Sequence, residues 1–295
     1  MKLIRFLDGD RACLGVLEAN GEDVRPLAGE PAGDLVPLIE AWMAGDRAGL
    51  TGAGAPTRLL RELKLLAPIS SPRRNIICVG KNYREHADEF SRSGFDGSST
   101  STDAVPKHPI FFTKPATSVI GPGDAIDPHS ELTDSVDYEA ELAVIIGRGG
   151  RGIEAKDVAA HIWGYTLIND ITARDLQKRH TQWFLGKSLD TFCPMGPWVA
   201  TADEVDLADL TIECRVNGDL RQQARVADLI FDIPTLVSTL SAGITLQPGD
   251  IIATGTPVGV GIGFDPPKFL REGDVVSVSA DGLGTLTNHV TAPPR

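Results

Sequence analysis

The chain has 295 residues, of which 42% are hydrophobic and 23% charged, and its formal net charge is −12. These values are ordinary for a globular protein with a large core, built as one large domain or as a large domain with a small one. The negative charge and the lack of a Lys/Arg-rich run argue against binding to nucleic acid or to an anionic membrane.

The cysteines and the first residues indicate the compartment. Four widely spaced cysteines form no CxxC pair, which argues against a zinc ribbon and a disulfide framework and suits a reducing environment. The N-terminal segment reaches Asp8 and Asp10 before an apolar core of the signal-peptide kind develops. We therefore expect a cytoplasmic protein.

Residues 1–67 are predicted to form a small β-rich N-terminal domain. Short apolar runs alternate with the turn signals Asp8-Gly9 and Asn20-Gly21, and residues 35–43 fit a short helix. No chemistry is evident in this part of the chain. Residues 68–295 are predicted to form the larger, catalytic domain.

The larger part begins with a short apolar strand over 75–79, followed by GKNYREHADEF. His86 and Glu89 share a face if this segment is helical, so they could form a dyad in which the carboxylate orients the imidazole as a general base. A solvated pair on a surface helix has the same spacing. Residues 91–109 are polar and broken by glycine, a composition typical of a mobile lid.

The stretch 136–147, VDYEAELAVIIG, is predicted to be a strand that enters the core. Alternation places Val136 and every second residue on one face, and Asp137, Glu139 and Glu141 on the other. Acidic side chains two apart lie roughly 7 Å from each other and repel. Such a face is stable if water solvates it or if a cation lies between the acids, and periodicity alone leaves both alternatives open.

Residues 162–169 fit a buried strand with Asp170 at its end, and Thr172 is placed to cap a following helix. In that helix Arg174 and Gln177 lie three apart, so they could hold a substrate carboxylate and carbonyl or could form a solvated face. Lys187 is expected in a loop between glycine and serine, where it could balance developing negative charge.

The last hundred residues are predicted to be mostly strands and turns, with one helix over 233–242 that begins after Asp232. The glycine-rich segment 255–263, GTPVGVGIG, lacks the spacing and the following helix of a nucleotide-binding loop. We instead expect its backbone N–H groups to approach an anion closely. The order of elements is mainly β with few helices (α+β) and shows no βαβ alternation.

Glu139, Glu141 and Asp170 together could supply three oxygen ligands to a divalent cation. Such ligands suit Mg²⁺ or Mn²⁺, and Ca²⁺ is a further candidate. The competing interpretation of Asp170 is a helix cap.

Five segments, in this order along residues 72–290, resemble the fumarylacetoacetate hydrolase family. They are CVGKNYREHADEF, DYEAELAVIIG, NDITARDLQ, QWFLGKSLDTFCPMGP and GDIIATGTPVGVG. Residues around FDPPKFLREGD look most like the branch that contains fumarylacetoacetate hydrolase domain-containing protein 2. The segment 91–109 departs from the family by its length, which leaves substrate size open.

The resemblance implies a mixed β-sandwich roll, as a homodimer, acting on a small 2-oxo acid. It implies that Glu139, Glu141 and Asp170 bind the metal and that His86 and Glu89 form the HxxE dyad of a lid. It further implies that Lys187 has a catalytic role and that Arg174, Gln177 and Thr254 contact substrate. Asp137 is not carried over, and we expect it to face the surface.

The leading hypothesis is metal-dependent hydrolysis of a C–C bond in an acylpyruvate-like substrate through an enolate, with His86 activating water. The alternative uses the same enolate without water attack, as an oxaloacetate keto–enol tautomerase or a decarboxylase or isomerase of a related 2-oxo dicarboxylate. A third hypothesis, from another class, is a non-catalytic binder on the same fold.

Overall fold

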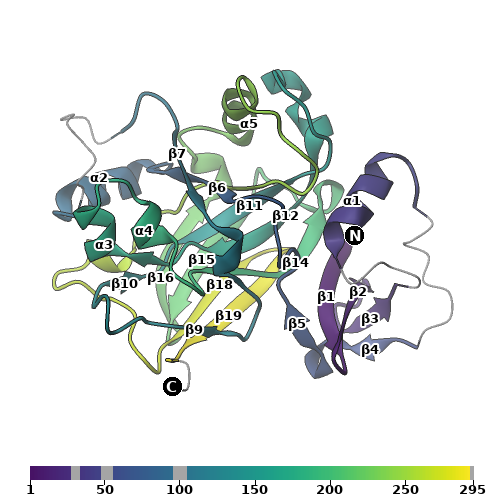
Figure 1. Cartoon of the computed structure of the whole chain (residues 1–295), viewed down its shortest axis with the longest axis horizontal. Coiled ribbons are helices and arrows are strands. Elements are labelled where there is room, and N and C mark those ends of the chain that lie inside the picture. The colour runs from purple at the N-terminus through teal and green to yellow at the C-terminus, as the bar shows by residue number, and fades with distance from the viewer. Residues whose placement is uncertain (28–33, 48–55, 96–104, 293–295) are drawn as a thin grey trace.

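Three β-sheets and five α-helices make up the part of the chain that the structure, a computed structural model, describes: residues 1–27, 34–47, 56–95 and 105–292 (Figure 1). The strands are β1 (Lys2–Asp8), β2 (Arg11–Leu17), β3 (Asp23–Pro26), β4 (Arg58–Leu59), β5 (Lys64–Leu66), β6 (Ile76–Gly80), β7 (Ile110–Lys114), β8 (Val119–Ile120), β9 (Ala125–Ile126), β10 (Val136–Asp137), β11 (Ala140–Ile146), β12 (Ile162–Asn169), β13 (Thr172–Ala173), β14 (Cys193–Thr201), β15 (Thr211–Val216), β16 (Asp219–Arg225), β17 (Ile251–Ala253), β18 (Val275–Ala280) and β19 (Gly284–Val290). The α-helices are α1 (Leu35–Met43), α2 (Arg84–Arg92), α3 (Arg174–Arg179), α4 (Phe184–Lys187) and α5 (Ile233–Ser241). Short 3₁₀ helices span Leu60–Glu62, Ala116–Ser118, Ala155–His161, Ala202–Glu204, Val226–Asp228 and Gly261–Gly263.

The largest sheet runs in the order β4-β3-β2-β1-β14-β12-β11-β17-β6-β7, with β5 beside β1 and β8 beside β14. A second sheet has the order β16-β15-β18-β19-β9, and β10 pairs with β13. Because β1 pairs with β14, the first strands of the chain extend the large sheet. The mixed β-rich architecture confirms the predicted fold class, whereas the domain boundary at residue 67 stays a prediction.

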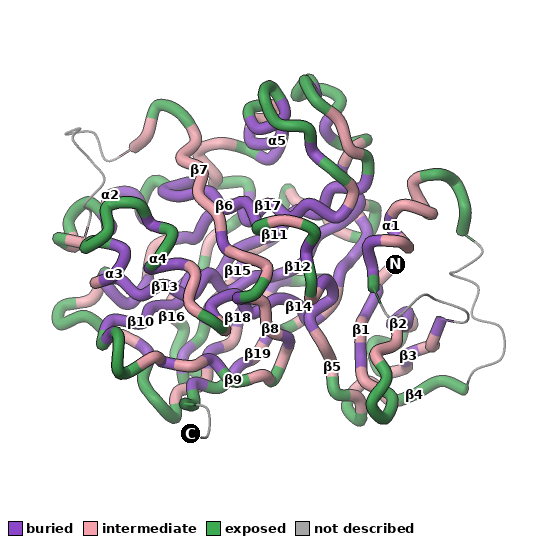
Figure 2. Tube along the Cα trace, in the orientation of Figure 1, coloured by how far each residue is buried: buried purple, intermediate pink, exposed green. Residues whose placement is uncertain are grey.

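Strand β11 lies between two hydrophobic cores and divides them by its alternation. Ala140, Leu142 and Val144 face a core shared with the five-stranded sheet and α5. Ala143 and Ile145 face the second core, which contains α1 and residues of β14. Figure 2 shows buried residues concentrated along β11, β12 and β14. A strand buried on both faces carries apolar residues without interruption, as Leu142–Ile146 does.

Most local predictions agree with the structure. The helix over 35–43 and the strand over 162–169 have the predicted bounds, and Asp232 caps α5 by accepting from Thr235 N at 2.8 Å. The single strand predicted over 136–147 is divided into β10 and β11.

Two local predictions are wrong. Thr172 does not cap α3, because its hydroxyl donates to the Asp170 carbonyl at 2.9 Å and the N-cap position is Ala173. Lys187 ends the short helix α4 rather than lying in a loop.

Two further predictions concern the lid and the membrane. The proposed lid, 91–109, includes residues 96–104, which lie outside the described residues. Among the helices that the structure describes, none combines the length and the apolar character needed to cross a bilayer.

Candidate functional site

The acidic face of the strand at residues 136–141 is buried. Asp137, Glu139 and Glu141 have relative exposures of 0%, 4% and 1%. Water therefore does not solvate these carboxylates, which removes one of the two alternatives left by the sequence. Asp137 does not face the surface, so that expectation is wrong. The strand pairing explains the burial, because β10 pairs with β13 and β11 lies between β12 and β17.

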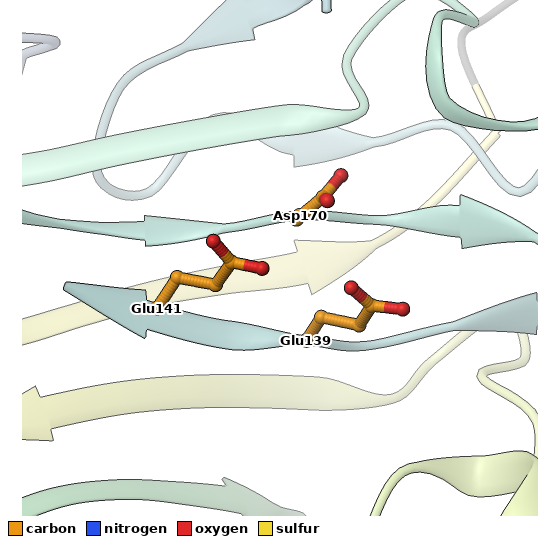
Figure 3. Close-up of side chains that lie close together, drawn as sticks. All are labelled: Glu139, Glu141 and Asp170. Atoms are coloured by element: carbon orange, nitrogen blue, oxygen red, sulfur yellow. The ribbon is translucent and has the colours of Figure 1, made fainter. Parts of the chain in front are cut away.

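Three carboxylates of the face and its neighbour meet at one point. Each of Glu139, Glu141 and Asp170 offers an oxygen within 4.8 Å of the other two (Figure 3). Glu141 lies in β11 and Glu139 directly precedes that strand. Asp170 follows the adjacent strand β12, whose Asn169 pairs with Ala140. Antiparallel pairing thus brings together residues that are about thirty positions apart in the chain.

Buried cations hold two of these carboxylates. Lys187 Nζ donates to Glu139 Oε2 and to Asp170 Oδ2, both at 2.8 Å. Arg174 Nη1 lies 2.7 Å from Glu139 Oε1. Burial alone would raise the pKa of Glu139, but Lys187 and Arg174 lower that pKa to about 2. Burial likewise opposes the Lys187 ammonium, yet Asp170 and Glu139 raise the pKa of Lys187.

The third carboxylate has no such compensation. Among the described residues Glu141 has no ion pair, and its Oε2 accepts only from Gly255 N at 2.8 Å. Burial, followed by the charges of Asp170 and Glu139, raises the pKa of Glu141 well above its ordinary value. Asp170 Oδ1 accepts no hydrogen bond from the described residues, although Lys114 Nζ lies 2.6 Å away as an ion-pair partner.

These oxygens fit a hard divalent cation. Three buried carboxylates of this network, those of Asp137, Glu139 and Asp170, form ion pairs with the buried cations Lys114, Arg174 and Lys187, whereas Glu141 forms none among the described residues. A set of carboxylate oxygens is the donor type that Mg²⁺, Mn²⁺ and Ca²⁺ accept.

The predicted dyad also forms. His86 Nδ1 lies 3.2 Å from Glu89 Oε2, one turn along α2. His86 is only 4% exposed, and it lines a small cavity together with Glu139, Arg174 and Lys187. The solvated helix pair is therefore excluded as an interpretation. Because Glu89 occupies the Nδ1 side, Nε2 is the ring atom left to act on a ligand.

Arg174 and Gln177 line the same cavity, and both are buried. Gln177 Oε1 accepts from Arg174 Nη1 at 3.2 Å, which leaves the amide Nε2 of Gln177 as a donor. Arg174 Nη2 is buried without a hydrogen-bond partner among the described residues. A buried unpaired guanidinium donor is costly, so a ligand acceptor is the expected partner.

The glycine-rich segment 255–263 does bring backbone N–H groups to anions, but the anions are the protein's own carboxylates. Gly255 N donates to Glu141, Gly259 N to Glu89 at 3.1 Å, and Gly261 N to Asp137 at 2.6 Å. The backbone N–H groups of this segment therefore hold carboxylates of the site in position.

The segment after β17 places Thr256, and not Thr254, at the cavity. Thr254 Oγ1 donates to the Leu142 carbonyl at 3.0 Å in the sheet. Thr256 lines the cavity, and Gln222 Nε2 donates to its hydroxyl at 2.8 Å. The predicted substrate contact of Thr254 stays a prediction, and Thr256 is the better placed of the two hydroxyls.

Sequence reasoning missed two lysines of this site. Lys114, at the end of β7, is fully buried, and Nζ donates to the carbonyls of Ile171 and Lys187. Lys81 lines the cavity with a positive φ of 55°, a conformation that side-chain-bearing residues adopt rarely. A charged residue at the end of an apolar strand, as in IFFTK, was the available signal for Lys114.

We expect Lys114→Met to destabilise the protein by about 3–5 kcal/mol, because it leaves the buried Asp170 carboxylate without this cation and frees two backbone carbonyls. Urea unfolding measures the effect. The matched control is Lys64→Met, whose side chain is 61% exposed and 3.7 Å from Asp124 Oδ1. We expect the control to change stability by no more than about 0.5 kcal/mol. Equal effects of the two substitutions would contradict the structural role of Lys114.

Comparison with known proteins gives consistent matches over the whole chain. The family model described as fumarylacetoacetate (FAA) hydrolase C-terminal matches residues 75–291, and one described as Rv2993c-like, N-terminal matches residues 1–68. Two relatives are oxaloacetate tautomerase YisK of Bacillus subtilis and oxaloacetate tautomerase fahd2, mitochondrial, of Xenopus laevis. They are 53% and 45% identical over 232 residues, which are 78% of this chain and 74% and 69% of theirs.

A solved structure supports the same assignment. The maleylpyruvate hydrolase from Sphingobium sp. SYK-6, in complex with manganese (II) ion and pyruvate, is 33% identical with a TM-score of 0.77, and the match covers 100% of both chains. The predicted resemblance is thereby confirmed. The chain belongs to the fumarylacetoacetate hydrolase family.

Proposed function

We propose that this protein is a divalent-metal-dependent keto–enol tautomerase of oxaloacetate or of a closely related 2-oxo dicarboxylate. The observation that carries the proposal is that three residues line one cavity: His86, which Glu89 holds at Nδ1, Arg174, whose Nη2 is unpaired among the described residues, and Glu139. The names of the two relatives that are 53% and 45% identical support this choice over hydrolysis.

The small size of the cavity also favours a small acid. Its volume is about 20 Å³, little more than a single water molecule requires. Phe90, Phe112 and Trp183 enclose it on one side, and their rings pack edge to face with centroids 5.4–5.9 Å apart. Side chains must move to admit any substrate, and a four-carbon acid needs less displacement than a long acylpyruvate.

Each side chain has a defined task in this proposal. Arg174 Nη2 and the Gln177 amide hold the carboxylate and the 2-oxo oxygen. A divalent cation held by Glu139, Glu141 and Asp170 would supply Lewis-acid polarisation of the 2-oxo acid. The Lys187 ammonium offsets negative charge that develops on the oxygen.

Proton transfer is the task of the dyad. His86 Nε2 takes a proton from C3, the C3–H electrons form the C2=C3 double bond, and the C2=O π electrons move to the oxygen. The protonated imidazole then gives its proton to that oxygen, which yields the enol. The reverse sequence gives the keto form. Glu89 holds the Nδ1–H side of the ring, so the protonated imidazole is stabilised while it carries the proton.

A substrate panel tests the proposal. We expect conversion of enol-oxaloacetate, followed by its ultraviolet absorbance, to exceed the cleavage rate of acylpyruvates by at least about tenfold with Mg²⁺ or Mn²⁺. Removing the metal with EDTA is expected to lower the rate by about 100-fold, because polarisation of the carbonyl contributes several kcal/mol.

The panel also decides between the competing functions. Faster cleavage of an acylpyruvate would favour C–C hydrolysis, and a structure of similar fold is described as a maleylpyruvate hydrolase. Release of CO₂ from oxaloacetate would favour decarboxylation. Metal binding without turnover of any member would favour a non-catalytic binder. The homodimer stays a prediction of the family resemblance.

A further inference from the structure

Asp137 is buried beside the metal-binding carboxylates but makes a different set of contacts. Its Oδ2 accepts from Arg174 Nε at 2.9 Å and from Ile262 N at 3.1 Å. Its Oδ1 accepts from Gly261 N at 2.6 Å and from Tyr138 N at 2.9 Å. Four donors therefore converge on one carboxylate, which offers about four lone-pair sites. A neutral amide would point its NH₂ group at two of these donors.

Asp137 and two further residues fix two of the three guanidinium nitrogens of Arg174. Asp137 holds Nε, and Gln177 and Glu139 hold Nη1, whereas Nη2 has no hydrogen-bond partner among the described residues. A free arginine side chain would lose about 2 kcal/mol of rotamer entropy when it binds a ligand. A guanidinium that is already fixed avoids most of this loss, so the remaining donor is preorganised for an anion.

The same backbone segment also holds the dyad. Gly259 N donates to Glu89, and two residues later Gly261 N donates to Asp137. The glycines are needed for this approach: a Cβ at Gly263 would lie 1.8 Å from Glu89 Oε1, and one at Gly261 would lie 2.6 Å from Asp137 Oδ1. Segment 259–263 thus contacts both Glu89, the partner of the general base, and Asp137, the partner of the Arg174 guanidinium.

We propose that Asp137 is a positioning residue for recognition of the substrate carboxylate: it orients Arg174 so that Nη2 is free for the ligand, and it links that guanidinium to the segment that holds Glu89. The proposal deepens the proposed function and rests on it for the identity of the ligand as a 2-oxo acid. It assigns a role to Asp137, the one acid of the DYEAEL stretch that is not a predicted metal ligand.

The experiment uses Asp137→Asn, with Asp134→Asn as the matched control. Asp134 is exposed three residues earlier, and its carboxylate accepts from Ser135 Oγ at 2.7 Å. Pyruvate is the probe, titrated calorimetrically into the full chain with saturating Mn²⁺. We expect Asp137→Asn to weaken pyruvate binding about 10- to 100-fold, the size typical of losing an outer-shell partner. We expect Mn²⁺ affinity to stay within about twofold of the wild type.

A double-mutant cycle with Arg174→Lys separates positioning from a merely structural role. Lysine keeps the charge but lacks the Nε–H donor that Asp137 holds. We expect Asp137→Asn to cause no further loss of pyruvate affinity in the Arg174→Lys background. Additive effects of the two substitutions would overturn the proposal, as would wild-type pyruvate affinity in Asp137→Asn.

A second variant covers the case in which Asp137→Asn does not fold. Gly261→Ala places a methyl group 2.6 Å from Asp137 Oδ1 and 2.5 Å from the Lys268 carbonyl oxygen, and displacement of the Asp137 carboxylate is expected to weaken pyruvate binding in the same way. Loss of folding in both variants would assign Asp137 to structure alone and overturn the proposal. If the wild type binds pyruvate with Mn²⁺ yet does not tautomerise oxaloacetate, the proposed function fails while this test of Asp137 stands.

Discussion

His86→Ala is expected to lower kcat for oxaloacetate tautomerisation by about 100- to 10,000-fold, the usual contribution of a positioned general base. The imidazole lines the cavity with Nδ1 against Glu89, and no other histidine of the described residues lines that cavity. Because His86 forms no hydrogen bond or ion pair with Glu139, Glu141 or Asp170 and is held by Glu89 instead, we expect Mn²⁺ affinity to remain. Stopped-flow kinetics and calorimetry on the same preparation measure the two quantities.

The matched control is His180→Ala, an exposed histidine that follows the helix of Arg174. We expect its kcat and KM to equal those of the wild type. Tautomerisation that survives His86→Ala undiminished would show that the dyad does not move the proton. A loss of Mn²⁺ binding in the same variant would instead assign His86 to the metal site.

Glu141→Gln is expected to abolish metal binding while leaving the metal-free protein at least as stable as the wild type. Glu141 has no ion pair among the described residues, and the nearby Asp170 and Glu139 carboxylates repel it. Removing the charge of Glu141 relieves that repulsion. It also replaces a carboxylate ligand of the metal with a neutral amide. We expect Mn²⁺ affinity to fall by more than about 100-fold, beyond the effect of an outer-shell substitution.

Thermal unfolding measures both parts of this prediction. Free Mn²⁺ at 100 times its Kd should stabilise the wild type by about 2.7 kcal/mol, or on the order of 5 °C in Tm. The Tm of Glu141→Gln should not respond to Mn²⁺, whereas the exposed control Glu272→Gln should respond as the wild type does. A Mn²⁺-dependent rise in the Tm of Glu141→Gln would exclude Glu141 as a ligand.

The order of side chains along the strand at residues 136–147 follows from the sequence alone. Alternation correctly places Tyr138, Ala140 and Leu142 in one core and sets Glu139 and Glu141 on the opposite face. Local spacing likewise predicts His86 beside Glu89, because residues three apart meet on a helix. These predictions succeed because periodicity depends only on neighbours in the chain.

Other features depend on partners that local spacing does not specify. Asp137 belongs to the acidic face by its pattern, yet three of its four donors come from Arg174 and from residues 261 and 262, more than thirty and more than a hundred positions away. Thr254 and Thr256 lie in one short segment, and only the pairing of β17 with β11 and β6 decides which of them lines the cavity.

The sequence by itself therefore determined which face of the strand is acidic, which family motifs accompany it and which residues are candidate ligands. Only the tertiary structure decided that the acidic face is buried and that Lys114 lies 2.6 Å from the Asp170 carboxylate. It also decided that Asp137 holds Arg174 instead of facing water. The physical reason is that burial and charge compensation depend on every element packed around a carboxylate. Side-chain alternation depends on the backbone of one strand.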